Sequence, residues 1–159
     1  MQKLLIKHFD ELTLRELYAL KQARDEVFFL EQRITDVDAD DVDFVCRHMW
    51  IEDDSQIAAY LRIIPAGAFY EEASIGRVLV RKPWRGKGLC RKMMWKAIEL
   101  IDKESEGSTI VIGAQSYLVN FYREFGFEPF GKEYIDAGIP HCHMKRAVSL
   151  VIKNKQCFL

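Results

Sequence analysis

The sequence predicts one α/β domain, because segments with strand patterns alternate with amphipathic helices along the chain. Its 159 residues suffice for a single domain, and they are 49% hydrophobic and 30% charged, which is typical of a folded globular protein. A domain of this size buries about 70% of the surface of its extended chain, so its core needs no disulfides or structural metals for stability. We expect this domain to span residues 1–148 and a tail to follow at 149–159.

The first half of the chain has the pattern of a strand, a long helix and three more strands. Residues 3–8 are the first predicted strand. Thr13 and Glu16 have the spacing of a capping box, and apolar residues then recur at helical spacing to about Glu31. The Asp-rich residues 32–43 are typical of a loop. Three strands are predicted next, at residues 44–51, 56–64 and 74–81.

The second half is predicted to contain two helices and three strands. A long helix follows the glycines after Pro83, and its apolar face comprises Leu89, Met93, Met94, Ala97, Ile98 and Ile101. Residues 109–114 have the pattern of a short buried strand. Residues 116–125 are predicted as a second helix, which Gly126 closes as a C-cap. The last two strands are expected at about 128–135 and 140–148.

Charge and cysteine spacing disfavour several classes of protein. The chain has 23 Lys and Arg against 24 Asp and Glu, whereas proteins that coat nucleic acid carry a large positive excess. Its four cysteines show no CxxC spacing, which favours free thiols in a reducing cytoplasm. No apolar run approaches the roughly 18 residues that a membrane span needs, and the first apolar stretch is too short for a signal peptide. We therefore expect a cytoplasmic protein that binds neither membranes nor nucleic acid.

One block of the chain is strongly basic. Residues 77–92 contain seven basic residues and no acidic one. The block begins in a predicted strand and enters the long helix through Gly86 and Gly88, which let a ligand approach the backbone closely. The first amides of a helix lack partners within the helix, and the macrodipole attracts anions there. We therefore predict a phosphate-binding site at this turn, with a solvated, glycine-containing helix start as the alternative.

The motifs of common nucleotide-binding folds do not fit this turn. GxxxxGK[ST] is absent, and GxGxxG fails because Arg91 stands at its third glycine position. Residues 85–90 (RGKGLC) instead resemble the Q/R-x-x-G-x-G/A motif with which the GCN5-related N-acetyltransferases (GNAT) bind the pyrophosphate of acetyl-CoA. The match departs at its last position, where Cys90 replaces Gly or Ala.

Other segments extend this resemblance over residues 1 to about 148. Residues 121–127 (FYREFGF) resemble the F-Y-x-x-F-G-F signature of the family, and Gln115 stands where many members have Asn. Three segments resemble a narrower group, the ElaA-like acyltransferases, and these are residues 24–32, 75–78 and 138–141. The resemblance implies a mixed, mainly antiparallel sheet flanked by helices. In its centre a parallel pair, at about 74–81 and 109–114, would splay apart.

The resemblance also implies how acetyl-CoA would be bound. Amides of the turn would hold the pyrophosphate, and they belong to Arg85, Gly86, Lys87, Gly88, Leu89 and Cys90. The cationic side chains of Arg85, Lys87 and Arg91 would add long-range attraction. The strand residues that would pair with the pantetheine arm are Val78, Leu79 and Val80. The amide of Leu79 or Val80 would polarise the thioester carbonyl. The position of Gln115 relative to the motif adds it to the residues expected to bind the cofactor.

The family chemistry implies an amine that attacks the thioester directly and displaces a thiolate. Its motif position makes Tyr122 the candidate general acid for that thiolate. An ordinary tyrosine pKa near 10 keeps such a group protonated at neutral pH, as an acid must be. The alternative is a core aromatic, a role for which Phe121 and Phe125, four residues apart, are better suited.

The general base has two candidates. Glu31, at the end of the first predicted helix, is one, and a surface glutamate near a helix end is the alternative for it. His48 is the rival, with a half-buried structural histidine as the alternative. Arg77 would either hold an acidic group of the acceptor or pair with a neighbouring carboxylate. His141 would line the acceptor pocket, through the match of residues 138–141.

Two further chemistries are disfavoured. In a strand, His141 and His143 share a face while Cys142 points away, so the three cannot converge on one ion, and we predict no metal. Cys90 lies near a helix start among cations, which would lower its pKa, but direct transfer needs no protein nucleophile.

The sequence therefore favours an acetyl-CoA-dependent N-acyltransferase that acts on a small-molecule or peptide amine. One alternative is a non-catalytic acyl-CoA-binding module that keeps the phosphate turn. The other, a nucleic-acid binder with a basic patch, is disfavoured by the net charge of −1. A monomer and a homodimer agree equally well with the sequence.

Overall fold

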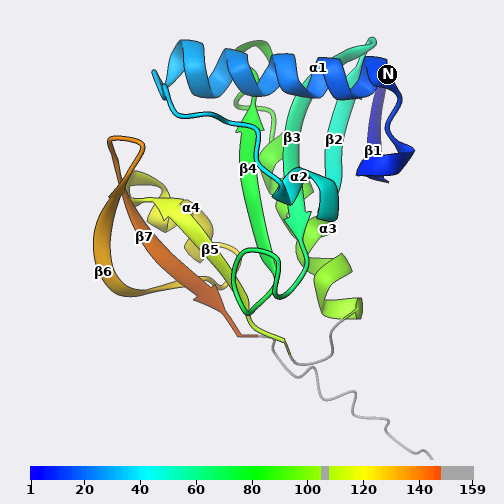
Figure 1. The fold of residues 1–159 in the computed structure, drawn as a ribbon. Helices are drawn as coiled ribbons and strands as arrows, with labels where there is room; N and C mark the ends of the chain where they lie inside the picture. The colour runs from blue at the N-terminus through cyan, green and yellow to red at the C-terminus, as the bar shows by residue number, and fades with distance from the viewer. Residues whose placement is uncertain (105–107, 148–159) are drawn as a thin grey trace, which may run out of the picture.

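The computed structural model describes residues 1–104 and 108–147, and its strands form two sheets (Figure 1). The first sheet has the order β1 (Gln2–His8), β2 (Arg47–Asp53), β3 (Gln56–Ile64) and β4 (Ser74–Val80), and its strands pair antiparallel. The second has the order β5 (Ile110–Gln115), β7 (Ile139–Arg146) and β6 (Glu128–Asp136), also antiparallel. The predicted tail 149–159 lies outside the described residues, as does position 148.

The two sheets meet at one point and then separate. An isolated parallel bridge joins Ala73 to Ile110, and the Val111 amide donates to the Ala73 carbonyl at 3.0 Å. Beyond this bridge β4 and β5 run in the same general direction but diverge, which leaves an open wedge between the sheets (Figure 1). The mixed α/β architecture agrees with the fold class that the sequence predicts.

The first predicted helix is confirmed, with a change of winding near its end. α1 (Leu14–Arg24) starts at Thr13, whose hydroxyl accepts from the Glu16 amide at 3.2 Å, as the capping box predicts. From Asp25 the chain continues as the π-helical segment η2 (Asp25–Glu31), in which Gln32 donates to Val27 five residues back. Such wider turns are frequent at functional sites, and η2 forms one wall of the wedge.

α1 and α3 (Leu89–Glu104) cover opposite faces of the first sheet. The six apolar residues of α3 that the sequence assigns to one face are all buried, and they pack on Met49 and Ile51. Trp50 and Tyr60, which alternate with these positions, pack instead against α1 and η2. Among the described residues, no helix combines the length and apolar character that a bilayer crossing requires.

Two predicted boundaries are wrong. The strand expected at 44–51 begins only at Arg47, because residues before it form the short helix α2 (Val42–Val45). This turn is held by the buried Asp43 side chain, which binds two arginines from other elements.

The helix expected at 116–125 is divided into a 3-10 turn, η4 (Ser116–Leu118), and α4 (Val119–Arg123). Gly126 does close it, with φ of +84°.

Candidate active site

The wedge between β4 and β5 is lined by side chains that form a cleft of about 870 Å³. One wall comes from η2, β4 and the loop between η2 and α2. The other comes from β5, β6, β7 and the connection before β4. Five of the site residues that sequence analysis names line the cleft, and they come from β4, β5, α4 and β7: Arg77, Val78, Gln115, Tyr122 and His141. The fold thus brings together residues that are far apart in the sequence.

Tyr122 is largely buried beside the cleft. Its residue is 7% exposed, and its ring packs against Phe121 and Phe127 at centroid distances of 5.3 and 6.3 Å. Among the described residues, none hydrogen-bonds its hydroxyl. Burial raises the pKa of Tyr122 well above its ordinary value, and the nearby Cys90 adds to this shift. The phenol is therefore protonated at neutral pH and free to donate to a group in the cleft.

A bulge in β4 sets which backbone groups face the wedge. The register with β3 shifts by one residue opposite Leu61, where Arg77 has φ of +52°. Beyond the bulge, Arg81 donates its amide to Ala58 at 3.0 Å, so by alternation the Leu79 amide also faces β3.

The Val80 amide faces the other way by the same alternation, towards the open edge of β4. The Val80 carbonyl agrees with this direction, since it accepts from Nε of Arg85 at 2.8 Å rather than from β3. Of the two amides that the sequence proposes for the thioester carbonyl, the register leaves that of Val80 on the side of the wedge.

The glycine turn between β4 and α3 is open. Gly86 and Gly88 have φ of +74° and +75°, and a Cβ at either would meet no atom within 4 Å. The Gly88 carbonyl accepts from Lys92 at 3.1 Å, which starts α3. Lys87 is exposed at the tip, whereas Leu89 is buried in the core. The turn thus presents free helix-start amides in a space that an anion can enter.

Two of the three cations assigned to this turn are paired with carboxylates. Arg85 contacts Glu31 at 2.6 Å, and Arg91 donates to Glu124 at 2.8 Å. Glu31, a candidate base, is thereby tied to the glycine turn, and it is not among the residues that line the cleft. Lys87 has no ion pair within the described part of the chain.

The cationic environment does not activate Cys90. The thiol is mostly buried against the core, and burial raises its pKa to about 11, although Arg91 opposes this shift. The expectation of a lowered pKa is therefore wrong, because desolvation outweighs the neighbouring charge.

His48, the rival base, lies outside the cleft. It is 1% exposed, with Nδ1 2.7 Å from the Tyr60 hydroxyl and Nε2 2.9 Å from the Asp43 carbonyl. Burial lowers the pKa of His48 from its ordinary value. With both ring nitrogens occupied inside the core, His48 has the structural role that the sequence gives as the alternative to catalysis.

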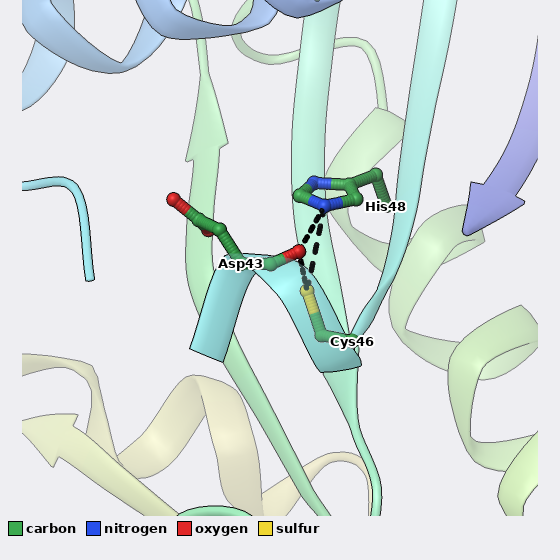
Figure 2. A group of neighbouring side chains, drawn as sticks. All are labelled: Asp43, Cys46 and His48. Atoms are coloured by element: carbon green, nitrogen blue, oxygen red, sulfur yellow. Dashed lines mark hydrogen bonds between the residues drawn. The ribbon is translucent and has the colours of Figure 1, made fainter. Parts of the chain in front are cut away.

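His48 also belongs to a cluster with metal-ligating side chains, formed with Asp43 and Cys46 (Figure 2). Their candidate ligand atoms lie within 4.8 Å of one another. However, one Asp43 oxygen already accepts from Arg24 and Arg62, at 2.7 and 2.9 Å. Burial raises the pKa of the Cys46 thiol to about 12. Two guanidinium groups and a protonated thiol make this a poor place for a cation.

Arg77 is held by carboxylates of the loop that forms one wall. Its Nε donates to Asp38 at 2.8 Å, and its Nη2 lies 3.4 Å from Asp40. Asp38 also accepts from Lys21 at 2.9 Å, and Asp40 binds Arg62 at 2.6 Å. Arg77 therefore pairs with neighbouring carboxylates, the second of its two predicted roles, and helps to fix this wall.

The ion pairs of Asp38 make stability depend on acid pH. Burial opposes ionisation, but Arg24 and Lys21 outweigh it and lower the pKa of Asp38 to about 2. Because the folded pKa lies below the unfolded one, this stabilisation is present above about pH 4 and is lost as pH falls towards 2. We expect Asp38→Asn to lower the free energy of unfolding by about 2 kcal/mol at pH 7. The difference between the variant and wild type should become smaller near pH 3. Urea denaturation measures this difference, and the exposed Asp10→Asn is the control.

Aromatic and amide side chains line the part of the cleft formed by β5, β6 and β7. Nδ1 of His141 lies 2.8 Å from the Ile139 carbonyl, and the Gln115 amide donates to Gln32 at 3.1 Å across the wedge. His141 and His143 both line the cleft, as strand alternation predicts. Sequence reasoning gave no role to Gln32, which follows η2 and ends the ElaA-like segment 24–32, or to Tyr134 on β6. A glycine inside a strand can indicate that another group approaches closely, and a Cβ at Gly113 would lie 2.8 Å from the Tyr134 hydroxyl oxygen.

Comparisons with known proteins agree among themselves. A family model described as an acetyltransferase (GNAT) domain matches residues 42–148. Protein ElaA of Escherichia coli K12 is 37% identical over 143 residues, which cover 89% of this chain and 94% of ElaA. A crystal structure of an acyl-CoA N-acyltransferase from Pseudomonas aeruginosa superposes with a TM-score of 0.87 at 34% identity, covering 92% of this chain and 100% of the other. That of Escherichia coli ElaA gives 0.85 at 34% identity, with 92% and 99% covered.

Proposed function

The chain belongs to the GNAT acetyltransferase family, and from this premise we propose that it moves an acyl group, in the first place acetyl, from acyl-CoA to an amine. Acyl transfer in general is the chemistry of the family. The observation that carries the finer proposal is the free hydroxyl of Tyr122 in the cleft where β4 and β5 diverge, next to the start of α3.

The proposed path of acyl-CoA follows the chain from the turn to the wedge. Amides between Gly86 and Cys90 bind the pyrophosphate, with Lys87 as the unpaired cation beside them. The pantetheine arm pairs with the open edge of β4, and the Val80 amide donates to the thioester carbonyl as negative charge develops on its oxygen. Arg85 leaves the Val80 carbonyl when the arm arrives, because both use the same strand edge.

The proposed chemical step is direct attack. The neutral amine attacks the carbonyl carbon, the tetrahedral intermediate collapses, and the C–S bond breaks. Tyr122 gives its hydroxyl proton to the departing thiolate, and the proton that the amide nitrogen loses restores the phenol. The acceptor is a small-molecule or peptide amine that reaches the cleft from the side of Gln32 and His141.

Two measurements test this proposal. Isothermal titration calorimetry with acetyl-CoA is expected to detect binding, and release of free CoA thiol is expected with a panel of primary amines. Binding without thiol release for any amine would favour the non-catalytic acyl-CoA-binding module. No heat with any acyl-CoA at millimolar concentration would contradict both functions.

The turn itself provides a sharper prediction. We expect Gly88→Ala to weaken acetyl-CoA binding at least tenfold, about 1.4 kcal/mol, because a side chain at φ of +75° strains the turn that aims the amides. Calorimetry measures the change. The matched control is Gly131→Ala on β6, which has φ of +72° and equally open surroundings away from the turn. Equal losses of affinity in the two variants would contradict a pyrophosphate site at Gly88.

A further inference from the structure

In the cleft, a backbone contact determines which ring nitrogen of His141 carries the proton and which carries the lone pair. Its Nδ1 lies 2.8 Å from the Ile139 carbonyl, and a carbonyl only accepts hydrogen bonds. The proton of the neutral ring is therefore on Nδ1, and Nε2 carries the free lone pair. Among the described residues, none hydrogen-bonds Nε2. The side chain lines the same cleft as Tyr122.

Residues on both neighbouring strands flank His141 in the cleft. On β6, Tyr134 stacks on the imidazole at a centroid distance of 5.8 Å and an interplanar angle of 28°. On β5, the neutral Gln115 is its register partner. The carboxylates that line the same cleft belong to Asp136, the last residue of β6, and to four residues of η2 and the loop after it: Asp25, Asp36, Asp38 and Asp40. Their negative charge favours a cationic amine in the cleft.

The other titratable groups are less suited to accept a proton from an amine. Asp38 and Asp40 are held in ion pairs with arginines, which keeps them ionised but weakly basic. Glu31 is bound by Arg85, and His48 is sealed in the core. His143 is enclosed by aromatic rings, with Tyr134 stacked on it at 4.6 Å, and no contact fixes its tautomer in the described part of the chain.

We infer that His141 is the general base, which takes a proton from the acceptor ammonium through Nε2; this rests on the proposed function. The ammonium loses one proton to His141, and the resulting amine attacks the thioester. The nitrogen loses a second proton as the intermediate collapses, and this one balances the proton that Tyr122 gives to the thiolate. His141 then releases its proton to solvent, so the reaction yields amide, CoA thiol and one proton. Imidazole suits this role because histidine is the side chain that most often serves as a general base in enzymes.

The test is a pH profile of kcat/KM for acyl transfer by wild type, His141→Ala and His143→Asn. We expect His141→Ala to lose between 10²- and 10⁴-fold in rate and to lose the acidic limb that wild type shows. Added imidazole is expected to raise the rate of His141→Ala at least tenfold, because a free base can enter the space that the side chain has left. His143→Asn is expected to keep the acidic limb. Calorimetry with acetyl-CoA checks that His141→Ala still binds the donor.

Three outcomes would decide against the inference. Full activity of His141→Ala, or a loss with an unchanged pH profile and no rescue by imidazole, would give His141 a structural role only. Loss of the acidic limb in His143→Asn alone would move the base to that residue. In each case wild type still transfers acyl groups, so the proposed function stands. No transfer by wild type with any amine would overturn the proposed function itself.

Discussion

Tyr122→Phe is expected to lower kcat for acyl transfer by about 10²- to 10⁴-fold, the range that one positioned acid contributes. The substitution removes one hydroxyl from a ring that is otherwise packed against Phe121 and Phe127, so the core should keep its shape. Without the phenol, the thiolate must leave unprotonated or wait for a proton from water. Single-turnover release of CoA thiol measures this step directly.

The same variant should bind acetyl-CoA as wild type does, because the proposed donor contacts lie on β4 and the glycine turn. Calorimetry therefore separates a loss of chemistry from a loss of binding. Tyr18→Phe is the matched control, since this tyrosine is exposed on α1 and far along the chain from the cleft. A full rate for Tyr122→Phe across the pH range would remove Tyr122 from the mechanism and leave it as a core aromatic.

The features that sequence analysis obtains correctly depend on neighbours in the chain. The cap at Thr13 uses a glutamate three residues on, and the buried face of α3 repeats at helical spacing. Gly126 ends a helix by its own backbone conformation. The acyltransferase motifs are of the same kind, because each is a short segment whose spacing is preserved. Each of these features depends on residues only a few positions apart, which is why the sequence alone predicts it.

The features that it misses depend on partners far along the chain. The pairing of Glu31 with Arg85, 54 residues away, is not predicted. A carboxylate partner for Arg77 is one of its two predicted roles, but its identity is not, and Asp38 lies 39 residues away. No periodic pattern in the sequence predicts either of these two ion pairs. The pKa of Cys90 is raised because the fold buries the thiol, although its sequence neighbours are cations. Neighbouring charges in the sequence therefore predict the direction of a pKa shift only for a side chain that remains exposed to solvent.

Substitution of Asp43 is expected to cause the largest loss of stability in this protein. One Asp43 oxygen accepts from both Arg24 and Arg62, whose residues are 1% and 2% exposed. Asp43→Ala leaves two buried guanidinium groups near each other without their shared anion, which costs about 3–5 kcal/mol. Thermal and urea unfolding at pH 7 measure this change. The wall loop should loosen as well, because Arg24 and Arg62 also hold Asp38 and Asp40.

Comparison with Asp43→Asn separates charge from packing. Asparagine keeps the accepting oxygen and the volume but not the negative charge, so its loss should fall between wild type and Asp43→Ala. Glu104→Gln is the surface control, because its ion pair with Arg47 lies at the exposed end of α3 and should contribute less than about 1 kcal/mol. If Asp43→Ala cost no more than Glu104→Gln, then the two arginines would be satisfied by Asp38 and Asp40 alone. The turn at α2 would in that case owe its position to packing around Cys46 and His48, rather than to the buried charge.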